Sequence, residues 1–112
     1  MMSYKEAGAA FRPGMIGKMT LKNRLIVPAM VVNSNQADGM ATERYIQYHE
    51  EKAKGGWGMI ITEDYAVTPY AGGFRNLAGL WSDEQIESHK KFVDRIHALD
   101  TKICCQIYHA GR

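Results

Sequence analysis

Three side chains stand at or just beyond the ends of strand-like runs, and their types are suited to holding a ligand. Gln106 carries a carboxamide, which can both donate and accept hydrogen bonds. Met30 offers a polarisable thioether surface. Asp64 adds a carboxylate directly after an apolar run. These residues predict a binding site, and the pattern assigns no catalytic residue.

Cys104 and Cys105 are neighbours in the sequence. Adjacent side chains on a strand point to opposite faces, so these two thiols cannot jointly hold one metal ion. Free cysteine commonly behaves as a small buried hydrophobe. We therefore expect two reduced packing cysteines, with no disulfide and no metal site.

The composition indicates one soluble-type domain. The chain has 112 residues, of which 46% are hydrophobic and 23% charged, with a net charge of +2. This charge is too small to predict nucleic-acid binding or attraction to an anionic membrane. No apolar run approaches the roughly 20 residues that span a bilayer. Since residues 1–6 lack an apolar signal core, we expect a cytoplasmic protein.

The first half of the chain reads as a hairpin, a strand and a helix. Turn residues up to about Asn23 predict an N-terminal hairpin. The apolar run 25–27 predicts a strand buried on both faces, which Pro28 ends. A helix should begin after Thr42 and end at 55–56. Its apolar stripe consists of Tyr45, Ile46, His49 and Ala53.

The second half repeats the order of strand, helix and strand. Residues 57–62 predict a second buried strand, and 64–80 a long loop. The sequence 82–85 is a capping box that should open a second helix, ending near Asp100. A third strand is expected over 102–108. The stripe expected on the second helix is Ile86, Lys90, Val93, Ile96 and Leu99.

Alternating strands and helices predict an α/β fold with a parallel sheet. Two architectures compete: a doubly wound sheet and a (β/α)₈ barrel. A doubly wound nucleotide-binding domain normally carries a glycine-rich phosphate turn after its first strand. Residues 28–33 contain no such turn, and no G-x-G-x-x-G occurs in the chain. The barrel is therefore favoured.

Several motifs, in order along nearly the whole chain, resemble the Old Yellow Enzyme family of flavin-dependent ene-reductases. They are residues 19–24, 28–30, 38–42, 55–63, 81–83 and 106–112. Within that family, 27–30 and 45–49 are most similar to the larger branch. This branch contains proteins like 2,4-dienoyl-CoA reductase and bile-acid enoate reductase.

The resemblance implies a TIM barrel that holds FMN at the carboxyl ends of its strands. In that family NADH or NADPH reduces the flavin, which then reduces an activated C=C bond of an enone or enoyl substrate. The family's FMN-contacting positions correspond here to Pro28, Ala29, Met30, Val31, Asp64 and Gln106. Val31 departs from relatives that carry Thr or Cys, because valine has no side-chain donor for a flavin carbonyl.

Other polar residues are expected in supporting roles. Asn23 and Arg24 precede the first strand, where barrel residues serve stability. The resemblance implies that His109 and Arg112 shape the loop after the third strand. The remaining histidines, on the expected helices, are read as surface or packing residues: His49, His89 and His97.

A complete barrel takes about 250 residues, and this sequence predicts only three of its strands. We therefore expect residues 1–112 to be the N-terminal part of an FMN-binding barrel, without activity or tight FMN binding of its own. The alternative is a non-catalytic partial barrel. Its third strand would be an exposed edge through which it associates with itself or with another chain.

Overall fold

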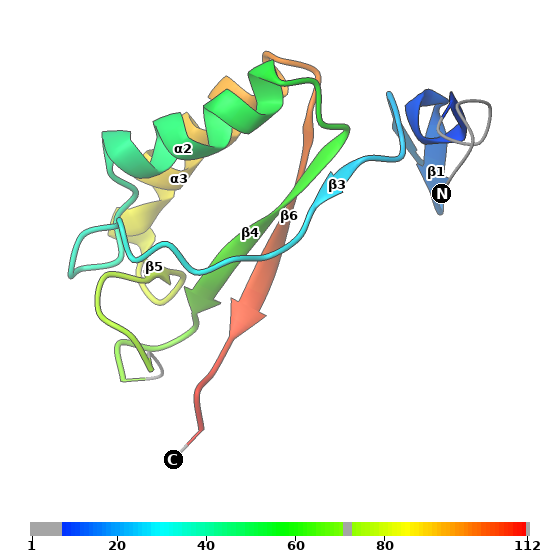
Figure 1. Cartoon of the computed structure of the whole chain (residues 1–112). Coiled ribbons are helices and arrows are strands. Elements are labelled where there is room, and N and C mark those ends of the chain that lie inside the picture. The colour runs from blue at the N-terminus through cyan, green and yellow to red at the C-terminus, as the bar shows by residue number, and fades with distance from the viewer. Residues whose placement is uncertain (1–7, 71–72, 112) are drawn as a thin grey trace.

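The computed structural model describes residues 8–70 and 73–111 (Figure 1). The residues outside this part include Arg112, so the role expected of that residue lies outside the described residues. The elements follow in the order η1 (Gly8–Phe11), β1 (Gly14–Ile16), β2 (Met19–Leu21), β3 (Ile26–Val27), α2 (Glu43–Lys54), β4 (Met59–Ala66), β5 (Ala78–Gly79), η2 (Asp83–Gln85), α3 (Ile86–His97) and β6 (Lys102–Tyr108).

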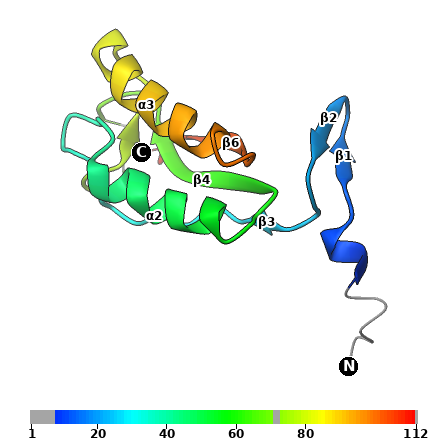
Figure 2. The same cartoon turned by 90° about the horizontal axis from the view of Figure 1, so that it is seen from above.

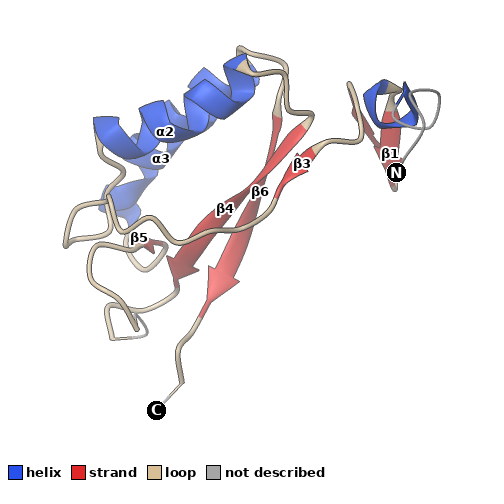
Figure 3. Cartoon of the chain, in the orientation of Figure 1, coloured by secondary structure: helices blue, strands red, loops and turns tan. Residues whose placement is uncertain are grey.

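Strand β4 is the centre of a parallel sheet. Strand β3 and the short β5 pair with opposite ends of β4, and β6 pairs along most of its length. Helices α2 and α3 lie together on one face of this sheet, and no helix of the described residues covers the other face (Figure 3). The predicted parallel α/β arrangement is confirmed. None of the described helices has the length and apolar character needed to cross a membrane.

Helix α2 forms where the sequence predicts it, for the predicted reasons. The Thr42 side chain accepts a hydrogen bond from the Tyr45 N–H at 3.1 Å, which caps the first turn. Gly55 follows the last turn as the C-cap. The buried residues of this helix are Tyr45, Ile46, His49 and Ala53, the stripe expected from the sequence.

Helix α3 packs on the core with part of the expected stripe: Ile96 is buried in the core cluster, and Val93 and Leu99 pack against it. Gln85 Oε1 accepts from the backbone N–H groups of Trp81 and Ser82, so this side chain closes the turn before the helix. Ile86 is 55% exposed and Lys90 is also exposed, so the predicted stripe is wrong at both positions. The buried residues of α3 are His89, Phe92 and Ile96.

The aromatic packing between the helices and the sheet explains why His89 and Phe92 are buried in place of Ile86 and Lys90. Phe92 lies 5.1 Å from Tyr45 between ring centroids, and His89 lies 4.9 Å from Tyr65. Because aromatic rings bury a large area, they centre the buried side of α3 on Phe92 and His89, with Val93 and Ile96 beside them. The core cluster is Val27, Tyr45, Ile46, Ala53, Ile60, Phe92 and Ile96.

The predicted hairpin is present as β1 and β2, and it lies away from the helices and the main sheet (Figure 2). Asn23 follows it and joins it to the sheet. Its Nδ2 donates to the carbonyl of Gly56 at 2.7 Å, and its Oδ1 accepts from the Leu25 N–H at 3.1 Å. Asn23 therefore has the structural role expected of it, at the start of β3.

Three expectations for the strands and their residues are wrong. Strand β4 continues to Ala66 instead of ending at Thr62, and β5 lies within the expected loop 64–80. Cys104 and Cys105 are free thiols that are both exposed, not buried packing residues. The reason is that no helix of the described residues covers one face of β6, and no described strand lies along its second edge.

Candidate functional site

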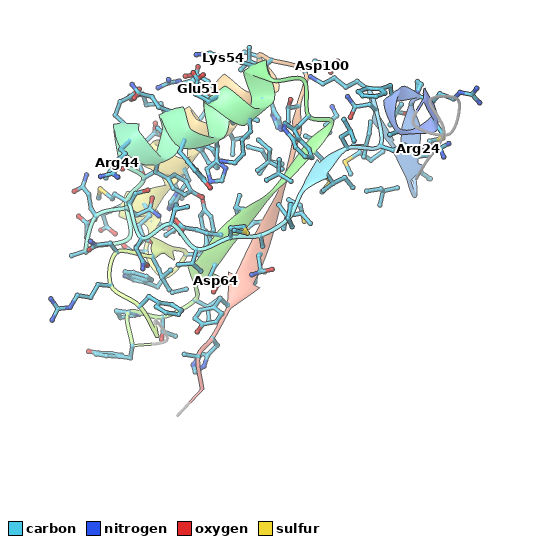
Figure 4. All side chains as sticks on the ribbon, viewed as in Figure 1. Arg24, Arg44, Glu51, Lys54, Asp64 and Asp100 are labelled. Carbon is cyan, nitrogen blue, oxygen red and sulfur yellow. The ribbon has the colours of Figure 1, made fainter. Side chains whose placement is uncertain are left out.

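The residues predicted to bind a ligand lie at the carboxyl ends of β3, β4 and β6. Because these strands are parallel, their carboxyl ends meet at one edge of the sheet. Figure 4 shows Asp64 at this edge, at the opposite end of the sheet from Arg24 and Asp100. One face of the sheet is covered by no helix of the described residues, and it extends to this edge. We call this face the open face.

A bulge in β4 determines where the side chains at this edge point. Ile61 pairs with Cys104 of β6 and Asp64 with Gln106, so three steps along β4 match two along β6. Such an extra residue changes which face each following side chain occupies. Ile60 lies in the helix-side core before the bulge, and Tyr65 contacts His89 of α3 after it.

Thr62 satisfies the backbone at the bulge. Its Oγ1 accepts a hydrogen bond from the Gln106 N–H at 3.3 Å and donates to the Glu63 carbonyl at 2.9 Å. The Thr62 side chain is 1% exposed. The Gln106 N–H therefore has an acceptor even though the strand pairing is irregular here. This hydrogen bond holds β6 against β4 near its carboxyl end.

The bulge brings Asp64 and Gln106 together. The Gln106 Nε2 donates to Asp64 Oδ1. Asp64 is 7% exposed, whereas Gln106 is exposed. Asp64 was expected in a loop after the strand, and this is corrected: it belongs to β4, which the bulge extends. The carboxylate orients the amide, whose remaining N–H and oxygen suit a ligand edge with both donors and acceptors.

Residues Pro28, Ala29, Met30 and Val31 follow β3 without regular structure. Met30 is 61% exposed and Val31 is 37% exposed. Pro28 is also exposed, and Ala29 is half-buried. This turn therefore presents an apolar surface just beyond the carboxyl end of β3. Its side chains contribute no hydrogen-bond donor, so donors to a ligand here must come from the backbone.

Glu63 is a site residue that sequence reasoning missed. Its side chain is 0% exposed and accepts from the backbone N–H of Val32 at 2.7 Å and of Asn33 at 3.3 Å. Asn35 Nδ2 donates to its other oxygen at 2.5 Å. Burial raises the pKa of Glu63, and these three hydrogen bonds oppose that rise. The only sequence signal was a single carboxylate at the end of an apolar run.

The other polar residues near the edge act locally. His109 is exposed, and its Nδ1 accepts from the Gly111 N–H at 2.9 Å, so it shapes the chain after β6 as expected. Within the described residues, no group of three or more His, Cys, Asp or Glu side chains could hold a metal ion.

The hollows of the described chain lie elsewhere. One of about 830 Å³ is lined by residues from Gly79 to Val93, and one of about 530 Å³ lies between Ala66 and Trp81. The candidate binding residues do not line either of them. The candidate site in this chain is therefore an open surface. A ligand bound there would contact the protein on one side only.

Comparison with curated proteins gives relatives that are longer than this chain. It is 38% identical over 103 residues to an NADPH dehydrogenase of Halalkalibacterium halodurans, covering 91% of the chain and 30% of the relative. It is 35% identical over 105 residues to an NADH oxidase of Thermoanaerobacter brockii, covering 91% of the chain and 16% of the relative. The chain thus spans less than a third of the length of these relatives.

Solved structures match the fold with the same partial coverage. The Old Yellow Enzyme from Pichia sp. AKU4542 superposes with a TM-score of 0.83 at 32% identity, over 90% of this chain and 26% of that one. The old yellow enzyme from Trypanosoma cruzi gives a TM-score of 0.84 at 34% identity, over 94% of this chain and 28% of that one.

The match to a family model covers almost the whole chain. The model of the NADH:flavin oxidoreductase / NADH oxidase family matches residues 9–112. The parallel strands and the two helices on one face are those of the N-terminal part of the Old Yellow Enzyme TIM barrel. The chain belongs to the NADH:flavin oxidoreductase / NADH oxidase family.

Proposed function

We propose that this chain supplies the first part of the FMN site of a flavin-dependent ene-reductase that uses NADH or NADPH. The observation that carries the proposal is the Asp64–Gln106 pair, together with the exposed Met30 and Val31 that follow the neighbouring strand β3. All four residues lie at the carboxyl ends of the parallel strands, where barrel enzymes build their active sites. The substrate class proposed for the whole enzyme is a small enone or enoyl compound.

The residues at the open face fit FMN in their chemistry. The carboxamide of Gln106 offers a donor and an acceptor, which match the pyrimidine edge of a flavin. Met30 provides a polarisable apolar surface for the ring. When bound, FMN supplies the hydride chemistry that these side chains lack. The backbone of Asp64 and of the turn 28–31 would lie beside it, and this chain's residues would bind and orient it.

Asp64 would act on the ligand through Gln106. The Asp64 carboxylate accepts a hydrogen bond from one N–H of the Gln106 amide. This contact fixes the rotamer of Gln106 and therefore the direction of its carboxamide oxygen. A preorganised amide loses less conformational entropy when a ligand binds. Val31 would add no side-chain hydrogen bond to the flavin, in contrast to relatives with Thr or Cys.

We further propose that the parent enzyme belongs to the branch of 2,4-dienoyl-CoA reductase-like and bile-acid enoate reductase-like proteins. This rests on the motifs 27–30 and 45–49. The match to a Thermoanaerobacter NADH oxidase, of which the chain covers only 16%, is compatible with a larger enzyme. A test is whether an enzyme containing this segment reduces enoyl thioesters faster than simple enones.

The main experiment is a chimera. The 103 residues that align at 38% identity would replace the matching segment of the Halalkalibacterium NADPH dehydrogenase. We expect the purified chimera to retain FMN and oxidise NADPH, and Gln106→Leu to weaken FMN binding by about tenfold, as loss of a ligand hydrogen bond implies. Gln47→Leu, on the exposed side of α2, is the matched control. A folded chimera without flavin would contradict the proposal.

A second candidate function concerns the chain alone. Ile107 on β6 is 71% exposed, beside two exposed thiols on a strand with one free edge among the described residues. Such an edge favours pairing with another chain. A non-catalytic partial barrel would then associate with itself in the cytoplasm or complete another chain. Light scattering over a range of protein concentrations tests this, and a monomer at all concentrations would exclude self-association.

A further inference from the structure

Glu63 and Asp64 are consecutive residues whose carboxylates serve different segments. Asp64 accepts from Gln106 of β6, whereas Glu63 accepts from the loop that follows β3. Consecutive side chains of a strand point to opposite faces, so the two carboxylates are directed to different segments. Glu63 thereby connects the end of β4 to the loop carrying the proposed flavin contacts.

A carboxylate that is 0% exposed must find hydrogen-bond donors inside the protein. All three donors come from one short segment: the N–H groups of Val32 and Asn33, and the side chain of Asn35. Two successive backbone N–H groups converge on the same oxygen, Oε2, as in anion-binding backbone turns. The carboxylate occupies the position that an external anion would take in such a turn.

The backbone of this segment depends on that contact. Asn33 has a φ of 50°, a left-handed conformation that costs free energy for residues other than glycine, although asparagine adopts it more readily than most. Residues 28–34 belong to no helix or strand, so the sheet does not satisfy their N–H groups. Glu63 supplies the acceptor for two of them directly after Val31.

We propose that Glu63 is a positioning residue that fixes the loop after β3, so that Pro28–Val31 present a preformed flavin-binding turn. This inference rests on the proposed flavin function. Glu63 itself does not face the ligand, because its oxygens are turned into the loop and its side chain is buried. It acts through Val32, Asn33 and Asn35.

The direct test is amide hydrogen exchange on the full chain. In Glu63→Gln one oxygen and the charge are lost, and we expect protection at Val32 and Asn33 to fall at least about tenfold, as the loss of a charged hydrogen bond implies. Protection at Ile46 and Ile60, in α2 and β4, should stay unchanged. Glu51→Gln is the control, since the Glu51 side chain is 71% exposed.

A double variant separates positioning from a general structural effect. In Glu63→Gln combined with Asn35→Asp, the introduced amide can donate to the introduced carboxylate, so the pair is rebuilt with donor and acceptor exchanged. We expect this variant to recover most of the protection at Val32 and Asn33. If Glu63→Gln unfolds the chain, Asn35→Ala removes one donor and should lower protection in the 32–35 segment alone.

In the chimera, Glu63→Gln should also weaken FMN binding by about tenfold, and the double variant should restore it. Unchanged protection at Val32 and Asn33 in Glu63→Gln would overturn the inference. So would a loss in Glu63→Gln and Asn35→Ala that is equal throughout the chain. A chimera that never holds FMN would count against the proposed function, while the exchange result would still decide whether Glu63 holds the loop.

Discussion

Strands β4 and β6 pair with each other in one sheet, yet they differ in the burial of their side chains and in how many strands lie beside them. Every residue of β4 apart from Ile61 is buried, whereas Cys104 to Ile107 of β6 are exposed. Strand β4 has neighbours on both edges and two helices over one face. Strand β6 has a neighbour on one edge among the described residues. The exposed apolar side chains of β6 therefore indicate a surface to which another segment or another chain could bind.

The largest contrast should come from the same substitution in each strand. Ile60 of β4 is 0% exposed and Ile107 of β6 is 71% exposed. We expect Ile60→Ala to lower the free energy of unfolding by about 2–5 kcal/mol, because it leaves a cavity in the core. Ile107→Ala should change it by less than about 0.5 kcal/mol. Urea unfolding at low protein concentration measures both, and equal losses would mean that β6 is covered.

A buried histidine between helices α2 and α3 should also make the free energy of unfolding depend on pH. His49 is 2% exposed, both of its ring nitrogens are without hydrogen-bond partners among the described residues, and burial lowers its pKa to about 4. An unfolded histidine has a pKa of about 6.5. Below that pH the unfolded chain binds a proton that the folded chain does not, so stability falls as the pH drops.

The expected loss between pH 6.5 and 4 is on the order of 3 kcal/mol, and no loss from His49 should occur above pH 6.5. His49→Leu should remove most of this slope in urea unfolding measured at several pH values. Some slope should remain because burial also lowers the pKa of His89. His97→Gln, at an exposed position of α3, is the control. If His49→Leu left the pH dependence of stability unchanged, the buried His49 ring would not be its cause.

A smaller effect should appear where the two strands lose their regular pairing. Thr62→Val removes the hydroxyl that accepts from the Gln106 N–H at the bulge. Leaving that N–H without its acceptor should cost about 1–3 kcal/mol. Hydrogen exchange at Gln106 should accelerate more than at Ile103, which pairs before the bulge. Thr20→Val on the exposed hairpin strand is the comparison, and equal acceleration at both β6 positions would argue against a local role.

The smallest effect on stability, and the sharpest test of the exposed strand, is Ile107→Lys. We expect the free energy of unfolding to change by less than about 0.5 kcal/mol, since the side chain already faces solvent. Any concentration-dependent association seen by light scattering should decrease, because a lysine on an edge strand opposes pairing. Association that persists unchanged would mean that another surface is responsible.

The sequence predicted the regular elements well where pattern and capping agree. Thr42, the glycines at 55–56 and the spacing of Tyr45 and His49 define α2 without help from the rest of the fold. For α3 the same reasoning was right for Val93, Ile96 and Leu99, wrong for Ile86 and Lys90, and did not find Phe92 and His89. The decisive residues there, Phe92 and His89, pack against rings from α2 and β4, and such contacts between distant segments leave no periodic signal.

The candidate site was predicted in part. Strict alternation along β6 indicated that Gln106 lies opposite the helix-facing residues, and Ile103 does pack against the core cluster. The contact of Gln106 with Asp64 could not be predicted, because a bulge inserts a residue without changing the composition of the strand. Glu63 was missed because its partners lie in the segment 32–35, and contacts between distant segments leave no pattern in the sequence. Flavin contact by these residues stays a prediction.

The measurement that tests the central claim most directly is a titration of the 112-residue chain with FMN, followed by flavin fluorescence with light scattering on the same sample. The described residues form only one side of a flavin site, and Met30 and Gln106 are exposed at the carboxyl ends of β3 and β6. We therefore expect no saturable binding at micromolar FMN. Tight, stoichiometric binding by a monodisperse monomer would contradict the account, because it would mean that this chain alone builds a complete flavin site.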